Sequence, residues 1–334
     1  MVTVAVDAMS GDHGLSTTVP AALAAVSVNA KLHILLVGDK AQLEPLVAKS
    51  SHLDRITIVH STEVVEMDEP PAQALRSKKD SSMRLAINAV KDGDAQACVS
   101  AGNTGALMAT AKFVLKTMDG IDRPAICSRL PTLDGVVYML DLGANVDSSP
   151  EHLKQFAVMG EQLCKALSDT VSPRVALLNI GSEEIKGNEL VKQSAELIAP
   201  LPINYVGFVE ADEIFHGKTD VVVCDGFVGN VALKTLEGTA KMIAHFMRAE
   251  FNSSLISKAS GLAAMPVLKR LGKRIDPRKY NGATFLGLKG AVIKSHGGAD
   301  VVAFQNAIEI AMHEAELDVP KRISDAMSES KVTE

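Results

Sequence analysis

The sequence predicts an α/β fold in which a largely parallel β-sheet lies between two layers of helices. Three observations support this prediction. The 334 residues are 47% hydrophobic and 22% charged, which suits one large domain with a substantial core. Short apolar runs alternate with longer segments of helical pattern along almost the whole chain. The runs are continuously apolar rather than alternating, as in strands that are buried on both faces.

The expected elements follow one another with little interruption. Val2–Val6 is a β-branched strand, and the Ala-rich stretch after Pro20 is a helix. Leu32–Val37 is an apolar strand that stops at Gly38, where Asp39 can cap the next helix. Further strands are expected at Arg55–Val59, Gln96–Val99, Val136–Leu142, Val175–Ile180, Ile203–Val206 and Val221–Cys224, and further helices near 81–90, 106–117, 151–167, 188–198 and 228–250. One domain is expected over 1–325, followed by a polar tail at 326–334.

Composition excludes several classes of protein. A formal net charge of -6 argues against a general nucleic-acid binder, which would carry a basic surplus. Cys98, Cys127, Cys164 and Cys224 form no CxxC pair, so we expect buried free thiols in a reducing compartment and no metal site. The first residues lack the basic start of a secretory signal, and no apolar run is long enough to span a bilayer. We therefore expect a cytoplasmic protein, or one that touches a membrane only from the side.

The most informative residues lie where the expected strands end. Loops after parallel strands share one edge of the sheet and lead into helix N-termini, which attract anions. Five such loops are rich in Gly, Asn, Ser and Asp, which permit close approach of a ligand and offer donors. They are Asp7–Gly14 (DAMSGDHG), Ser100–Gly105 (SAGNTG), Asp141–Asn145 (DLGAN), Asn179–Asn188 (NIGSEEIKGN) and Asp225–Asn230 (DGFVGN). Any one of these loops could simply form a turn, because the same residue types favour turns. Five on one predicted edge favour a ligand that carries phosphate.

Standard nucleotide and hydrolase motifs do not account for these loops. There is no GxGxxG loop, and Gly217-Lys218-Thr219 lacks the earlier glycine of a P-loop. GxSxG, HExxH and kinase motifs are also missing. His313 and Asp318 have the HxxxxD spacing of some glycerolipid acyltransferases, but they lie in an amphipathic helical stretch. We interpret that spacing as a coincidence on a surface helix.

The order of these runs resembles a known family, the bacterial phosphate acyltransferases, which are acyl-ACP:phosphate transacylases also called PlsX. The resemblance covers about residues 2–320 and departs in the first loop, where Ser10 replaces an expected Gly and His13-Gly14 replaces a Pro-containing turn. The stretches that carry it are DAMSGD, SAGNTGALM, DLGAN, NIGSEEIKGN, DVVVCDGFVGNVALK and GATFLGLKGAVIKSHGG.

The resemblance implies a fold, a reaction and partners. The fold would be the two-lobed α/β/α sandwich of phosphotransacetylase and the isocitrate/isopropylmalate dehydrogenases, with a cleft between the lobes. The reaction would convert acyl-ACP and inorganic phosphate to acyl phosphate and ACP, in membrane phospholipid synthesis. A homodimer is implied and no cofactor. Fold alone would not settle the chemistry, since one scaffold hosts several reactions.

Residue types suggest how such a reaction could proceed. Phosphate is already nucleophilic near neutral pH, so the site must hold an anion against a thioester carbonyl and stabilise the developing oxyanion. Lys186, which is flanked by Glu183, Glu184 and Asn188, would supply a cation; alternatively it is a solvated loop lysine. Lys294 and His296 would meet phosphate or protonate the leaving thiolate; alternatively His296 caps a turn.

The remaining candidates divide into ligands and orienting groups. The expected phosphate ligands are Ser100, Gly102, Asn103, Thr104, Asn145, Asn188 and Asn230. Buried carboxylates at strand ends more often orient other groups than react. The expected orienting groups are Asp7, Asp12, Asp141 and Asp225.

A second feature is the segment 251–279, which holds seven basic residues and one acidic residue, a local charge of +6. Pro266 should break its helix and give a projecting helical hairpin. Apolar residues beside clustered cations fit a peripheral contact with an anionic membrane. The segment could instead form the dimer interface or receive the acidic ACP. The contact residues would be Leu255, Lys258, Leu262, Leu268, Lys269, Arg270, Lys273 and Arg274.

Two other functions remain open at this point. A short-chain acyl-CoA phosphotransacylase would use the same fold and the same anion-binding loops. A non-catalytic subunit that docks ACP or membrane would need the basic segment but no anion-binding loops. The full set of Gly- and Asn-rich loops argues against the second alternative.

Overall fold

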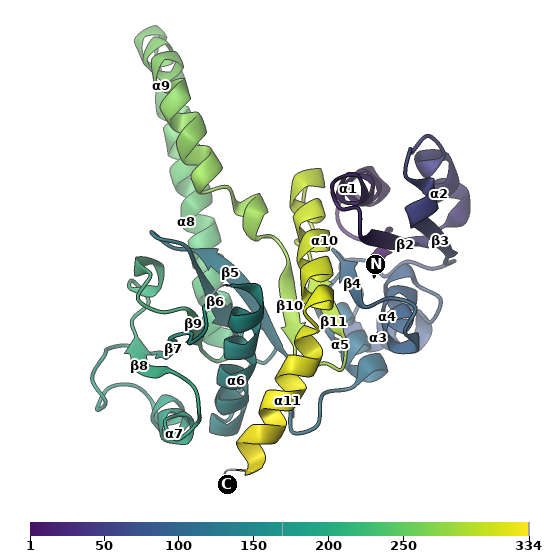
Figure 1. Cartoon of the computed structure of the whole chain (residues 1–334). Coiled ribbons are helices and arrows are strands. Elements are labelled where there is room, and N and C mark those ends of the chain that lie inside the picture. The colour runs from purple at the N-terminus through teal and green to yellow at the C-terminus, as the bar shows by residue number, and fades with distance from the viewer. Residues whose placement is uncertain (169, 333–334) are drawn as a thin grey trace.

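In a computed structural model that describes residues 1–168 and 170–332, one eleven-stranded sheet runs through the molecule (Figure 1). The strand order is β3-β2-β1-β4-β11-β10-β5-β6-β9-β7-β8. In chain order the strands are β1 (Val2–Asp7), β2 (Leu32–Gly38), β3 (Ile56–His60), β4 (Ala97–Ser100), β5 (Ala125–Pro131), β6 (Val136–Leu140), β7 (Val175–Leu178), β8 (Tyr205–Val209), β9 (Val221–Val223), β10 (Ala283–Leu286) and β11 (Ala291–Lys294).

Helices cover both faces of this sheet, which confirms the three-layer α/β/α prediction. One face packs against α3, α4, α5 and α8. The other face packs against α1, α2 and α10 in one half and against α6, α7 and α11 in the other. The helices are α1 (Leu15–Val28), α2 (Lys40–Val47), α3 (Pro71–Ser77), α4 (Ser82–Asp92), α5 (Thr104–Leu115), α6 (Pro150–Leu167), α7 (Glu189–Ile198), α8 (Gly226–Asn252), α9 (Leu255–Arg274), α10 (Val301–Glu316) and α11 (Val319–Val332), with short 3-10 helices at Leu53–Arg55, Ile214–His216 and Pro277–Tyr280.

The sheet consists of two parallel halves that run in opposite directions. β3, β2, β1, β4 and β11 are parallel to one another, as are β6, β9, β7 and β8. Between the halves, β11–β10, β10–β5 and β5–β6 are all antiparallel pairs. Three reversals leave the second half opposite to the first. The prediction that all five Gly- and Asn-rich loops share one edge is therefore wrong, because it did not include β5 or β10.

The two halves are staggered along β5, which belongs to both. The amino-terminal part of β5 pairs with β10, and its carboxyl-terminal part, from Ser128 to Pro131, pairs with β6. Lys294, at the end of β11, pairs with Ala283 at the start of β10. The strand ends of the first half therefore lie near the middle of β5, and so do those of the second half, where Asp141 follows β6.

Two expectations about helices also need correction. Pro266 does not break the helix but lies inside α9. The backbone carbonyl that loses its hydrogen-bond donor at this proline can face water, because the helix is exposed. The hairpin consists instead of α8 and α9, which turn at Ser253 and project from the body (Figure 1).

The expected polar tail from 326 is helical up to Val332, because Ile323 and Met327 on one face of α11 pack against α6. Residues 333–334 lie outside the described residues.

Two expectations drawn from composition can be compared with the structure. All four cysteines are buried free thiols, as predicted. Within residues 1–168 and 170–332, no helix is both long and apolar enough to cross a membrane.

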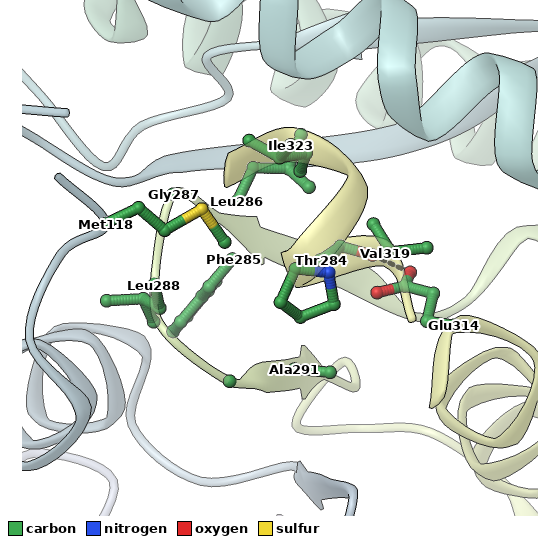
Figure 2. A pocket seen from close by; sticks show the side chains of 12 residues that line it. Met118, Thr284, Phe285, Leu286, Gly287, Leu288, Ala291, Glu314, Val319 and Ile323 are labelled. Carbon is green, nitrogen blue, oxygen red and sulfur yellow. Dashed lines mark hydrogen bonds between the residues drawn. The ribbon is translucent and has the colours of Figure 1, made fainter. Parts of the chain in front are cut away.

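A buried carboxyl group lies where α10, α11 and β10 meet. Figure 2 shows Glu314 of α10 pointing toward Thr284 of β10, whose hydroxyl donates a hydrogen bond to Oε1. Oε2 is buried and has no hydrogen-bond partner among the described residues. Burial raises the pKa of Glu314 to about 7, and the Thr284 hydrogen bond and the charge of Arg129 only partly oppose that shift. Ionised Glu314 is therefore an energetic cost of the folded state.

We expect Glu314→Gln to make folding stability less dependent on pH. Because the pKa of Glu314 is raised on folding, its contribution falls as pH rises from about 4.5 to about 7, by up to about 3 kcal/mol. The variant should therefore gain stability relative to the parent at pH 8 and lose that advantage near pH 5. Denaturant unfolding at both pH values measures the difference. An advantage of equal size at pH 5 and pH 8 would contradict the assignment.

Candidate active site

Two of the five expected loops, Asp7–Gly14 and Ser100–Gly105, meet the turn that follows Lys294 at the carboxyl ends of β1, β4 and β11. The amide of Ser295 donates to the carbonyl of Ser100 over 2.9 Å, and the amide of Asp12 donates to the carbonyl of Gly297, also over 2.9 Å. Gly11 lies between them with a φ of +83°, and a Cβ there would come within 3.0 Å of the Gly297 oxygen. These three loops are thus packed too closely for a side chain at position 11.

A buried carboxylate and a hydroxyl join the first two loops. The hydroxyl of Ser100 donates to Oδ2 of Asp7 over 2.6 Å and accepts from the amide of Gly102 over 3.1 Å. Both side chains are buried, and burial raises the pKa of Asp7 against the opposing effect of the Ser100 hydrogen bond. Asp7 thus orients the Ser100 hydroxyl, and its role toward the substrate stays a prediction. Ser100, predicted as a phosphate ligand, has its hydroxyl already engaged within the protein.

Lys294 lies at the centre of this arrangement. Its side chain is 9% exposed, and its ammonium group donates to the carbonyls of Ala101, over 3.3 Å, and Ser295. Burial lowers the pKa of Lys294 to about 8, although the charges of Asp12 and Asp7 favour the protonated form. Below that pH the site holds a poorly hydrated cation, which attracts anions more strongly than an exposed lysine does.

His296 opens the following turn and has a defined tautomer. Its Nδ1 accepts a hydrogen bond of 3.1 Å from the amide of Gly298, so Nε2 carries the proton of the neutral ring. Its own amide donates to Oδ1 of Asn281 over 2.9 Å. Burial lowers the pKa of His296, and the charges of Lys234 and Lys294 add to that effect. The turn-capping interpretation is thus correct, and the capping bond leaves Nε2–H as a donor.

Helix α8 contributes charges to the same site from the other half of the sheet. Lys234 and Glu237 form an ion pair of 2.9 Å, and both influence the ionisation of His296. Neither residue was predicted from the sequence. The signal that could have identified them is a cation and an anion three residues apart on a helix, one turn beyond the Asp225–Asn230 loop.

The N-terminus of α5 borders the site. Asn103 caps this helix by accepting from the amide of Ala106 over 3.0 Å, and its Nδ2 donates to the carbonyls of Met67 and Glu69. The Asn103 side chain therefore fixes the loop rather than reaching outward. Thr104 is exposed and follows the cap, so its amide is in the first turn, where no intrahelical acceptor exists. Anions are favoured at this position.

The predicted residues of the second half lie at the opposite edge of the sheet. Asp141 is fully buried and accepts hydrogen bonds from the amides of Ile126, Gly143, Ala144 and Asn145 and from the Asn145 side chain. Asp225 caps α8, and Asn230 lies against Gly143 one turn later. Burial raises the pKa of Asp141, and these donors oppose that shift. This cluster fixes the start of α8, which places Lys234.

Lys186 and Asn188 follow β7, at that same opposite edge. The Lys186 ammonium forms an ion pair of 2.8 Å with Glu183, which raises the pKa of Lys186, and Glu210 adds to the shift. Asn188 caps α7 by accepting from the amide of Val191. Asp12, Asp7 and Lys234 are the charges that act on Lys294, so Lys186 and Lys294 have different electrostatic partners.

The expected contact residues of the basic segment all lie in α9. Leu255 and Leu262 are 85% and 71% exposed. The base of the hairpin is attached to the body by Arg274, whose guanidinium donates to the carbonyl of Leu133 over 2.9 Å. From Leu255 at the tip to Arg270 the helix rises about 22 Å. The exposed apolar tip and the main group of cations are therefore well separated.

The site combines a buried cation, an Nε2–H donor and a helix N-terminus at one strand edge. This set can hold a dianion and stabilise negative charge that develops beside it. No group of three or more potential metal ligands occurs within residues 1–168 and 170–332.

Comparison with known proteins places the chain in a family. A family model described as "Fatty acid synthesis protein" matches residues 2–322. A protein named phosphate acyltransferase from Methylococcus capsulatus is 57% identical over 331 residues, covering 98% of both chains. Another of that name, from Alcanivorax borkumensis, is 58% identical over 335 residues, again covering 98% of both.

Solved structures agree at the level of the fold. A phosphotransacetylase from Streptococcus pyogenes superposes with a TM-score of 0.64 at 17% identity, covering 94% of each chain. A branched-chain phosphotransacylase from Enterococcus faecalis gives 0.58 at 14% identity, covering 94% of this chain and 99% of that one. The predicted phosphotransacetylase-type fold is thus confirmed. By its sequence the chain belongs to the phosphate acyltransferases, within the family of fatty acid synthesis proteins.

Proposed function

We propose that this chain transfers an acyl group from an acyl-ACP thioester to inorganic phosphate, as a step toward membrane phospholipid. The observation that carries this proposal is the placement of Lys294 and His296 beside the N-terminus of α5. The family supports the reaction class, because its members share the name phosphate acyltransferase.

The reaction needs phosphate and the thioester carbonyl to be held together. A phosphate oxygen attacks the carbonyl carbon, the electron pair of the C=O bond moves to oxygen, and the tetrahedral intermediate expels the thiolate of the carrier. The products are an acyl phosphate and the carrier thiol, which takes one proton. Positioning of the two reactants can supply up to about 7–11 kcal/mol, so no strong general base is required.

Each residue has a role that its surroundings support. The Lys294 ammonium neutralises phosphate together with the first amides of α5. The Nε2–H of His296 donates to the oxyanion or to the departing sulfur. The charges of Asp7 and Asp12 favour the protonated form of Lys294, and both residues act as orienting groups.

The direct test of the activity uses purified protein, palmitoyl-ACP and labelled phosphate. Formation of an acyl phosphate that reacts with hydroxylamine is the expected result. Acetyl-CoA and butyryl-CoA test the short-chain alternative, which the fold of the phosphotransacetylases also accommodates. Activity with these CoA esters alone would favour that alternative, and activity with none of the thioesters would leave a docking subunit.

The hairpin of α8 and α9 is proposed as the membrane contact. Leu255 and Ile256 at its tip are 85% and 80% exposed, and Lys258 lies one turn below. Apolar side chains beside a cation suit insertion between anionic headgroups. The protein would thus be cytoplasmic and peripherally bound to the membrane.

A second copy of the chain is proposed to cover the sides of the same hairpin. Met242, Ile243 and Phe246 of α8 are more than half exposed, and they follow one another at helical spacing. Homodimer formation would bury this stripe and leave the tip for the membrane. Sedimentation equilibrium tests the dimer.

Replacement of His296 tests its role as a hydrogen-bond donor at the reacting centre. We expect His296→Ala to lower kcat about 100-fold or more, because it removes the Nε2–H donor at the reacting centre. His296→Gln retains a donor and should recover part of that loss. Lys186→Ala serves as the comparison, since Lys186 lies at the other edge. A large loss in Lys186→Ala with a small loss in His296→Ala would reverse the assignment.

The ionisation of Lys294 should appear in the affinity for phosphate. Because burial lowers the pKa of Lys294 to about 8, the cation disappears as pH rises through that value. The KM for phosphate should therefore rise above pH 8 in the parent. Lys294→Gln should show a high KM with little dependence on pH over the same range. A parent KM that stays constant from pH 7 to pH 9.5 would contradict this role.

Negative charge at the hairpin tip should weaken binding to an anionic membrane. We expect Leu255→Glu/Ile256→Glu to reduce flotation with vesicles that contain anionic lipid about tenfold, because both exposed apolar contacts are replaced by like charges. The activity in solution should stay near that of the parent. Equal flotation of parent and variant would exclude the tip as the contact.

A further inference from the structure

A second basic surface lies far from the α9 segment in sequence. The residues of α3, α4 and the connection between them, together with α5 and its C-cap residue Lys116, include seven basic side chains and two acidic ones, whereas the whole chain has a net charge of -6. Both α3 and α4 pack against α5, so the three helices form one layer (Figure 1). The basic side chains are Arg76, Lys78, Lys79, Arg84, Lys91, Lys112 and Lys116.

An exposed aromatic ring lies within this surface. Phe113 of α5 is 53% exposed. Arg84 of α4 lies over the ring at 5.3 Å from its centroid, and Lys116 lies at 4.7 Å. Contacts of this kind hold the cations and the ring in one arrangement. An aromatic ring flanked by arginine is a common centre of a protein interface, because such residues lose little conformational freedom on binding.

The same helix leads to the candidate active site. Its first residue, Thr104, follows the loop that carries Ser100, and both Thr104 and Gly105 are exposed. Ala109 is half-buried, and Lys112 and Lys116 are exposed, so a continuous surface stripe follows α5 at helical spacing. Nine residues of helix separate Thr104 from Phe113, a rise of about 14 Å. A thioester on a flexible arm could reach the site from a partner that is bound at Phe113.

We propose that the α3–α5 face is the docking surface for the acidic protein that carries the acyl thioester, with its prosthetic arm lying along α5 toward Lys294. This inference rests on the proposed function and names where its protein substrate binds. A cationic surface on an otherwise acidic protein steers an acidic partner to one place and repels it elsewhere.

The composition of the face favours a protein partner over a membrane. Within the described residues of α3, α4 and α5, Phe113 is the one large hydrophobic side chain that is strongly exposed. A membrane contact would need more apolar area beside the charges. That combination occurs instead at the tip of the α8–α9 hairpin, where Leu255 and Ile256 are exposed.

The test compares two double charge reversals of equal size. Lys112→Glu/Lys116→Glu alters the proposed surface, and Lys31→Glu/Lys321→Glu makes the same change at two exposed lysines elsewhere. Steady-state kinetics are measured with palmitoyl-ACP and with palmitoyl-pantetheine, an uncharged donor that lacks the carrier protein. The first variant should raise the KM for palmitoyl-ACP about tenfold or more and weaken its dependence on salt. Its kinetics with palmitoyl-pantetheine, and both sets for the control variant, should stay within about twofold of the parent.

Several outcomes would overturn the proposal. An unchanged KM for palmitoyl-ACP in the first variant, or equal increases in both double variants, would remove the docking surface. Loss of binding to anionic vesicles with an unchanged KM would assign the face to the membrane. Phe113→Ser, which leaves the charges in place, should also raise the KM for palmitoyl-ACP, and thermal unfolding shows whether each variant is folded. A parent enzyme that forms no acyl phosphate from palmitoyl-ACP would instead refute the proposed function.

Discussion

The antiparallel pairings around β5 and β10 determine where the functional side chains can meet. β5 pairs with β10 along one part of its length and with β6 along the other, so the two parallel halves of the sheet are joined in opposite directions. The loops after β1, β4 and β11 therefore gather at one edge, and those after β6, β7 and β9 gather at the other. Helix α8 begins at the second edge and carries Lys234 to the surroundings of Lys294 and His296. The site thus draws on both halves although their strands run in opposite directions.

Burial gives this site its chemical character. Asp7 and Lys294 are both removed from water, and burial shifts the pKa of each toward the neutral form, while their mutual attraction opposes that change. Such a pair adds little net stability, since desolvation offsets most of the attraction. The Lys294 ammonium is instead held by hydrogen bonds to the carbonyls of Ala101 and Ser295, so its positive charge can still bind an incoming anion. Lys186, which has Glu183 at 2.8 Å, already has its counter-ion.

The sequence was sufficient for the layers of the fold and for the loops that build the site. Continuous apolar runs such as Val221–Cys224 identified the buried parallel strands correctly. The strands Ala125–Pro131 and Ala283–Leu286 were missed, because Ser128-Arg129 and Thr284 interrupt their apolar patterns. Without these two strands the reversal of strand direction could not be predicted. Lys294 and His296 could be recognised because the apolar run Ala291–Ile293 comes directly before them and a Gly-Gly turn comes directly after. The roles of Ser100 and Asn103 could not, because a polar side chain in a Gly-rich loop can serve the loop or the ligand, and only the hydrogen bonds decide.

The proposed activity requires phosphate to bind at the edge formed by β1, β4 and β11. A crystal structure of the protein grown with inorganic phosphate near pH 7 tests it most directly. We expect phosphate within hydrogen-bond distance of Lys294 Nζ, His296 Nε2 and the first amides of α5. Phosphate held instead by Lys186 and the Asn179–Asn188 loop, with the Lys294 site empty, would contradict it.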